Sequence, residues 1–134
     1  MGPAAEVDLG KRVRWEGSGA ARYLWFDCSD CNRDEAYALQ AAFQREVGGQ
    51  APGSARVLAD FENGYHESAL TQRWKDLYAE HDHRVQRIAC LGVVGTMKVV
   101  FAAYRFFVRF KGVDIDAKMR LFEDRDEALA WLLN

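Results

Sequence analysis

Short apolar segments alternate with longer amphipathic segments along nearly the whole chain, and this alternation restricts the fold more than any other feature. Strands are indicated by period-two patterns or by short runs of branched residues, and helices by apolar residues spaced three and four apart. The predicted strands are 12–16, 22–26, 56–61, 85–93 and 118–122. The predicted helices are 32–47, 67–78, 96–111 and 124–132.

This element order favours one fold class. The glycine-rich turn at 17–19 makes the first two strands a hairpin, and every later strand follows a helix. Strands joined through helices pair in parallel, and right-handed crossovers place the helices on the faces of the sheet. We therefore expect an α/β fold of order ββαβαβαβα, with a single mixed, mostly parallel sheet of four to five strands flanked by helices. A length of 134 residues suits a single domain, expected at 12–134 after a flexible leader at 1–11.

Composition and charge exclude several classes of protein. Hydrophobic residues make up 49% and charged residues 28% of the chain, which is typical of a folded globular domain. The net charge of -2 gives no overall basic field, so we expect no nucleic-acid partner. The first residues lack the pattern of a secretory signal, and the longest apolar stretch, 97–108, contains Lys98 and Arg105. We expect no transmembrane segment and a cytoplasmic location.

Three cysteines, Cys28, Cys31 and Cys90, are an odd number in a chain large enough to fold without disulfides. Cys28 and Cys31 stand between a strand and a helix, where a thioredoxin-type pair would stand, but two ordinary loop cysteines are the alternative. A third or fourth zinc ligand with suitable spacing is not evident, and neither a nucleophile elbow nor a phosphate-binding lysine motif is present. We predict no metal, no cofactor and no enzymatic activity.

The helix predicted at 96–111 carries more aromatic surface than one sheet can cover. At about 100° per residue, its cations Lys98, Arg105 and Arg109 form a narrow stripe, and apolar residues occupy most of the remaining circumference. The predicted interaction surface consists of Phe101, Tyr104, Phe106, Phe107 and Phe110. A neighbouring helix of the same domain, a second subunit, an apolar ligand or a membrane surface could cover this surface.

Three segments resemble one known family. They are the strand, glycines and lysine of 87–98, the strand Val57–Asp60 that ends in an acidic residue, and the C-terminal segment Leu121–Leu132. Each is similar to a signature of the SpoIIAA-like proteins, which belong to the STAS class of sulfate-transporter and anti-sigma-factor-antagonist domains. The resemblance implies a four- or five-stranded sheet flanked by helices, related to the CRAL-TRIO lipid-carrier fold. It implies no particular biochemical activity.

The same resemblance makes Ser68 a candidate phosphoacceptor, because antagonists of this class carry a phosphorylated serine at the start of the corresponding helix. The segment Glu67–Leu70 lacks the second serine and the glycine of that motif, so a serine that only caps the helix is the alternative. A second candidate site is an anion or headgroup contact before and along the helix at 96–111. Its residues are Gly92, Gly95, Thr96, Lys98 and Arg105, although a turn that needs glycine explains Gly92 and Gly95 equally well.

We therefore predict a non-enzymatic STAS-like module that acts in regulation or protein interaction. We expect it to form a homodimer, or to bind a regulatory protein, through the helix at 96–111. The alternative is a binder of a lipid or another apolar small molecule, as in CRAL-TRIO carriers, or a protein that contacts membranes peripherally.

Overall fold

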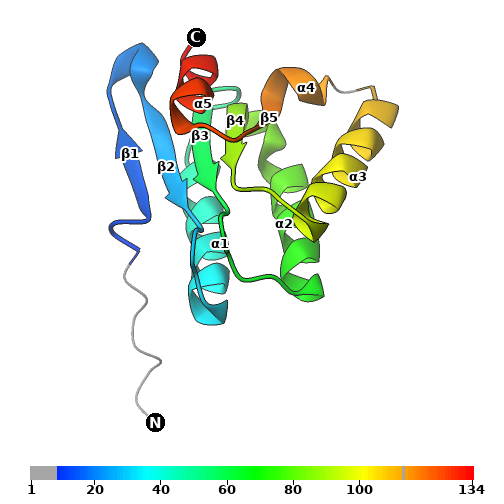
Figure 1. Ribbon diagram of the computed structural model, residues 1–134. Helices are drawn as coiled ribbons and strands as arrows, with labels where there is room; N and C mark the ends of the chain where they lie inside the picture. The colour runs from blue at the N-terminus through cyan, green and yellow to red at the C-terminus, as the bar shows by residue number, and fades with distance from the viewer. Residues whose placement is uncertain (1–8, 113) are drawn as a thin grey trace.

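The computed structural model of the protein describes residues 9–112 and 114–134 (Figure 1). Its strands are β1 (Val13–Glu16), β2 (Tyr23–Asp27), β3 (Ala55–Asp60), β4 (Val85–Leu91) and β5 (Met119–Phe122). Its α-helices are α1 (Arg33–Gly48), α2 (Ser68–His81), α3 (Thr96–Phe110), α4 (Ile115–Lys118) and α5 (Arg125–Leu132). Short 3-10 turns at Gly19–Ala21 and Asp82–Arg84 precede β2 and β4.

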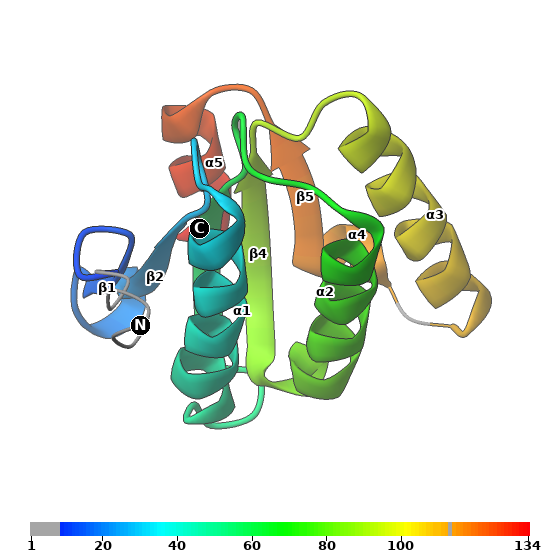
Figure 2. The ribbon, with the colours of Figure 1, turned by 90° about the horizontal axis from the view of Figure 1, so that it is seen from below.

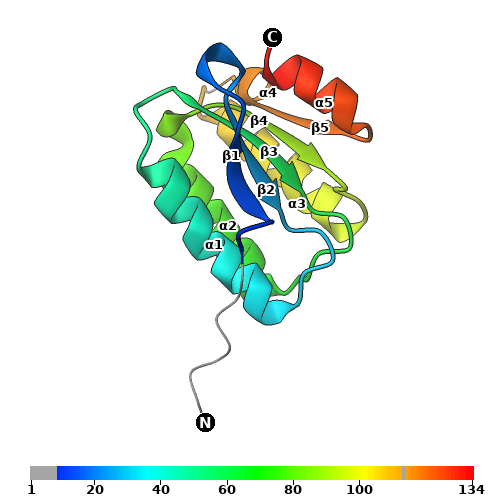
Figure 3. The ribbon, with the colours of Figure 1, turned by 90° about the vertical axis from the view of Figure 1, so that its left-hand side faces the viewer.

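The five strands form one sheet in the order β1-β2-β3-β4-β5. β1 pairs with β2 in antiparallel orientation, and the remaining neighbours pair in parallel. This arrangement confirms the predicted α/β fold with a mixed, mostly parallel sheet. Because consecutive parallel strands are also neighbours, right-handed crossovers bring α1, α2 and α3 to the same face. Figure 2 shows α1 and α2 side by side, with α3 beyond α2, and Figure 3 shows α5 on the opposite side of the sheet.

Each face of the sheet has its own apolar core, because successive side chains of a strand point to opposite faces. The larger core, which includes Phe26, Val57 and Cys90, lies under α1, α2 and α3. The smaller core contains Trp25, Leu58 and Ala89, which pack against Ala128 and Leu132 of α5. A single eight-residue helix thus covers one face, whereas three longer helices share the other.

Local capping explains where α1 and α5 begin. The Asn32 side chain accepts from the Glu35 backbone N–H, and the Glu35 carboxylate accepts from the Asn32 N–H, which together form a capping box. At α5 the Asp124 carboxylate accepts from the Glu127 N–H. The four-residue helix α4 was not predicted from sequence, because one turn is too short to show a helical period.

The expected leader at 1–11 lies for its first eight residues outside the described part of the chain. Within the described part, Leu9 packs against the larger core, and its carbonyl accepts from the backbone N–H groups of Arg12 and Val13. Leu9 therefore belongs to the packed domain, although it was expected in the leader. Among the described helices, none combines the length and the apolar character that crossing a bilayer requires.

Candidate functional site

A cavity of about 80 Å³ lies between α2, α3 and the sheet. The sheet contributes its floor, which includes Val57, Ala59, Ile88 and Cys90. The helix residues that line it are Thr71, Trp74, Lys75 and Tyr78 of α2, and Met97, Val100, Phe101 and Tyr104 of α3. Phe26, Phe43, Phe61 and Met119 complete the lining. Nearly all of these side chains are apolar, so the cavity suits an apolar occupant better than water.

Four aromatic rings of the cavity lining contact one another edge to face. The Trp74 ring lies 5.7 Å from the ring centre of Phe26 and 6.2 Å from that of Phe61. Phe61 in turn meets Phe101 of α3 at 5.9 Å. Edge-to-face pairs of this kind are favourable. The ring contacts therefore connect α2 to α3 through Phe61 at the cavity.

Tyr78 is the polar group held most deeply in this lining. Its side chain is 6% exposed, and its hydroxyl is buried without a hydrogen-bond partner among the described residues. Its ring meets that of Tyr104 at 5.6 Å. Burial raises the pKa of Tyr78 strongly, and burial also raises the pKa of Cys90 to about 12. The Tyr78 hydroxyl is therefore a neutral, buried group, and Tyr78 lines the cavity through its ring.

The opposite side of α3 presents apolar residues to solvent. Val99 is 69% exposed, Phe106 69%, Phe107 56% and Phe110 85%. We call Val99, Ala103, Phe106 and Phe110 the outer face of α3. Phe107 lies at its margin, where the Lys111 ammonium stands 4.5 Å from the ring centre.

The structure thus divides the interaction surface predicted from sequence into two parts. Phe101 and Tyr104 are partly buried and line the cavity, whereas Phe106, Phe107 and Phe110 are exposed. A helical wheel cannot separate these two parts, because it does not show which side faces the sheet.

Two cations of the predicted stripe bind a common carboxylate. The Asp116 carboxylate of α4 lies 2.5 Å from the guanidinium of Arg105 and 2.6 Å from that of Arg109. Hydrogen bonds from Arg109 and then Arg105 lower the pKa of Asp116 to about 2. These ion pairs join α3 to α4, and sequence patterns gave no signal for them because Asp116 belongs to the helix that was not predicted.

The turn before α3 brings only part of the predicted anion contact together. Gly92 has φ +69°, and a Cβ on it would lie 2.5 Å from the backbone nitrogen of Glu62, so a close approach of two loops requires this glycine. Gly95 is the N-cap residue of α3, and Thr96 and Lys98 follow in the first turn. Arg105 lies more than two turns further along α3, on Asp116, and is not brought to this turn. An anion at Gly92, Gly95, Thr96 and Lys98 stays a prediction.

Ser68 is exposed and is the first residue of α2, with Glu67 in the N-cap position. The Glu67 carboxylate accepts hydrogen bonds from the hydroxyls of Tyr37 and Tyr65, and Arg33 lies 3.5 Å away. These hydrogen bonds lower the pKa of Glu67 and raise those of both tyrosines. Ser68 is thus accessible beside a carboxylate held by three side chains. Sequence reasoning missed this cluster, because two of its members lie on α1, about 30 residues away.

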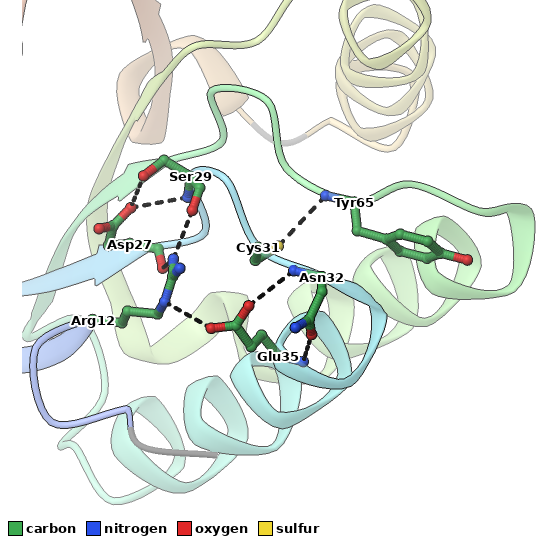
Figure 4. Close-up of polar contacts among 7 residues, drawn as sticks. All are labelled: Arg12, Asp27, Ser29, Cys31, Asn32, Glu35 and Tyr65. Atoms are coloured by element: carbon green, nitrogen blue, oxygen red, sulfur yellow. Dashed lines mark hydrogen bonds and ion pairs between the residues drawn. The ribbon is translucent and has the colours of Figure 1, made fainter.

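The Cys28–Cys31 loop is tied down by hydrogen bonds, shown in Figure 4. The Asp27 carboxylate accepts from the backbone and the hydroxyl of Ser29, and the Ser29 carbonyl accepts from Arg12 at 2.6 Å. Cys31 Sγ accepts from the Tyr65 N–H at 3.5 Å (Figure 4).

Both thiols of this loop are free and buried. Burial, followed by the charges of nearby acidic groups, raises the pKa of Cys28 well above its ordinary value. A protonated, buried thiol lacks the reactivity of a redox nucleophile, which favours the reading of ordinary loop cysteines. In the described part of the chain, no three His, Cys, Asp or Glu side chains gather as a metal would require.

Comparison with known proteins gives one match. A family model described as SpoIIAA-like matches residues 28–133, which include three of the five strands and all five α-helices. Searches of curated proteins and of solved structures found no significant match. The match agrees with the segments at 57–60, 87–98 and 121–132 that resemble this family. The chain belongs to the SpoIIAA-like family.

Proposed function

We propose that this protein is a non-enzymatic regulatory module that self-associates through the outer face of α3. The observation that carries the proposal is the exposure of large apolar side chains on and beside that face. Phe106 is 69% exposed and Phe110 85%, and Phe107 at the margin is 56% exposed. Soluble monomers rarely expose a contiguous apolar patch larger than a few hundred Å², and such patches mark interaction sites. Family membership supports an interaction module of the STAS type.

The spacing of the outer face favours a second copy of the same helix as its partner. Val99, Ala103, Phe106 and Phe110 follow one another by four, three and four residues, which is the spacing of a helix–helix seam. In an antiparallel two-fold pair, Phe106 would meet Ala103 of the second copy, and Phe110 would meet Val99. Large side chains would then oppose small ones, so that both helices could approach closely. Each well-buried phenylalanine contributes about 1.5 to 3 kcal/mol before the cost of association.

Sedimentation of the variant Phe106→Glu tests this proposal. We expect the wild type to form dimers at tens of micromolar and the variant to be a folded monomer, because a carboxylate buried in an apolar interface is costly. The matched control is Ala41→Glu, which places the same charge on an exposed position of α1 and should leave the dimer intact. A monomeric wild type, or a dimeric Phe106→Glu variant, would contradict the proposal.

We also propose Ser68 as the regulatory phosphoacceptor. A phosphate there would lie at the N-terminus of α2, where the helix dipole stabilises anions, and would bring a second negative charge next to Glu67. We expect Ser68→Asp to change self-association or partner binding without unfolding the protein, and Ser68→Ala to behave as the unmodified protein. Unchanged association in Ser68→Asp, together with no phosphate on Ser68 in native material, would rule this role out.

A second candidate function is the binding of an apolar small molecule, and the cavity between α2 and α3 is the observation that favours it. Its lining is rich in aromatic and aliphatic side chains, as is usual in ligand pockets. Native mass spectrometry of protein purified from cells tests both functions together, because it reports subunit number and retained ligand. A dimer without added mass supports self-association alone, and a monomer with added mass supports ligand binding alone.

A further inference from the structure

We infer that the cavity between α2 and α3 takes a small, compact molecule without any hydrogen-bonding group, and that this molecule lies over Ala59 and Cys90 of the sheet. This inference rests on the second candidate function and specifies its ligand class and the place where the ligand lies. The experiment below is designed so that a failure of the ligand class can be told from a failure of ligand binding.

Two small residues of the sheet leave the space in which such a ligand would lie. Ala59 of β3 and Cys90 of β4 are register partners, and both line the cavity. Their outer neighbours in the same row are larger, because Phe26 pairs with Ala59 and Leu121 pairs with Cys90. The surface of the sheet is therefore lowest in the middle of this row, and residues of α2 and α3 complete the lining above it.

The wall of the cavity carries no polar surface. Thr71, Lys75 and Tyr78 belong to the lining, but they contribute only apolar atoms to it. Buried water needs about two to four polar partners, so this space does not suit water. A ligand with a donor or an acceptor would bury that group without a partner, which is costly. A molecule without such groups avoids this cost and gains dispersion contacts with the wall.

The size of the cavity limits the size of the probe. Its volume is about 80 Å³, whereas an apolar cavity of roughly 150 Å³ holds benzene or xenon. We therefore choose xenon and isobutene as apolar probes. Acetone is the matched polar probe, because it has the branched shape of isobutene with an oxygen in place of the methylene group. Binding is followed through the ¹³C-methyl signals of Val57, Ile88 and Met97 in the lining, with those of Ala128 and Leu132 on the opposite face as references.

We expect xenon and isobutene to shift the methyl signals of the lining in the wild type. Acetone should bind at least about tenfold more weakly than isobutene, because its oxygen would be buried without a partner. This comparison needs no variant and decides the ligand class by itself.

The variant Ala59→Val tests where the ligand lies. It should weaken isobutene binding strongly, because the added methyl groups occupy the space over Ala59 and Cys90. The variant should fold, because these atoms enter the existing cavity and valine is favoured in strands. The matched control Ala89→Val enlarges a buried strand residue that faces α5 and should bind isobutene as the wild type does.

Three results would overturn the inference, each in a different way. Acetone binding as tightly as isobutene would reject the ligand class and leave ligand binding standing. Equal affinities of the wild type and Ala59→Val for isobutene would show that the ligand does not lie over Ala59 and Cys90. If neither xenon nor isobutene shifted the signals of the lining, the inference would fall together with the second candidate function, while self-association would remain to be judged by sedimentation.

Discussion

Cys28 and Cys31 differ from the thiols of a redox pair in how completely the fold buries them. Both side chains are less than 10% exposed, and Cys31 already accepts a hydrogen bond from the loop that precedes α2. A redox nucleophile needs a thiolate that solvent and substrate can reach. In this loop the two cysteines instead pack in the larger apolar core.

We predict that Cys28 stays protonated in the folded protein over the pH range in which a free thiol ionises, because burial raises its pKa well above the ordinary value. Thiolate absorbance near 240 nm, followed from pH 6 to 9 in a variant with only this cysteine and corrected for tyrosinate with a cysteine-free variant, should rise only when the protein unfolds. In denaturant the same thiol should titrate at about 8.5. A thiolate signal below pH 8 in the folded protein would show that the loop opens to solvent.

Asp116 is the residue through which the protein should respond to acid. Its folded pKa is lowered to about 2 by Arg109 and Arg105, so the stabilisation that it contributes is complete above the ordinary pKa of about 4. That stabilisation is lost as the pH falls from about 4 to 2. We expect Asp116→Asn to be less stable than the wild type in urea at pH 6, with the difference shrinking towards pH 2.

The matched control for this measurement is Asp76→Asn, which removes the charge of an exposed carboxylate in the middle of α2, where the Gln72 amide donates to it. Its stability should follow that of the wild type over the whole pH range. If the difference between Asp116→Asn and the wild type were constant from pH 6 to 2, the two arginine contacts would not account for the stabilising effect.

At the scale of elements, α5 buries a narrower face than its helical spacing alone indicates. Helical spacing groups Trp131 with Ala128 and Leu132, but only the latter two are fully buried. Trp131 lies at the edge of α5, 5.6 Å from Phe122, with the guanidinium groups of Arg87 and Arg120 near its ring. The Arg87 guanidinium also donates to the Trp131 carbonyl and so satisfies the C-terminal end of the helix.

We therefore predict that Leu132→Ala destabilises the protein by about 2 to 5 kcal/mol, because it leaves a cavity in the smaller core. Trp131→Ala removes a larger side chain from a position that is only partly buried. Its loss of unfolding free energy should therefore be smaller per Å² of side-chain surface removed. Chemical denaturation of both variants measures the two losses. A loss below about 1 kcal/mol for Leu132→Ala would show that α5 contributes little to the stability of the fold.

The sequence was sufficient for the strands, the long helices and the side-chain caps of α1 and α5, since each depends on local spacing or on residues three apart. Asn32 with Glu35 and Asp124 with Glu127 are examples. It was not sufficient for groups that meet only after folding. The Glu67 cluster joins α1 to the start of α2, and the cavity is lined by residues from seven elements and a loop. No single period along the chain records such contacts.

On the scale of the whole molecule, α3 takes part in both proposed functions. Its inner side closes the cavity through Phe101 and Tyr104, and its outer face exposes Phe106 and Phe110. A ligand that moved α3 relative to the sheet would also move the outer face. Self-association and ligand binding would then influence each other through one helix, as linkage between two sites requires.

The last prediction concerns the dependence of stability on concentration, which a single folded monomer does not show. If the outer face of α3 is a dimer interface, unfolding releases two chains, so the apparent stability rises by about 1.4 kcal/mol of dimer for each tenfold increase in concentration. The melting temperature of the wild type should therefore increase between 2 and 200 µM. Phe106→Glu should melt at one temperature over this range, because its carboxylate prevents association, whereas Ala41→Glu should keep the dependence of the wild type. A wild type whose melting temperature does not change over the range would show that solvent alone covers the outer face, and the proposal of self-association would then have to be abandoned.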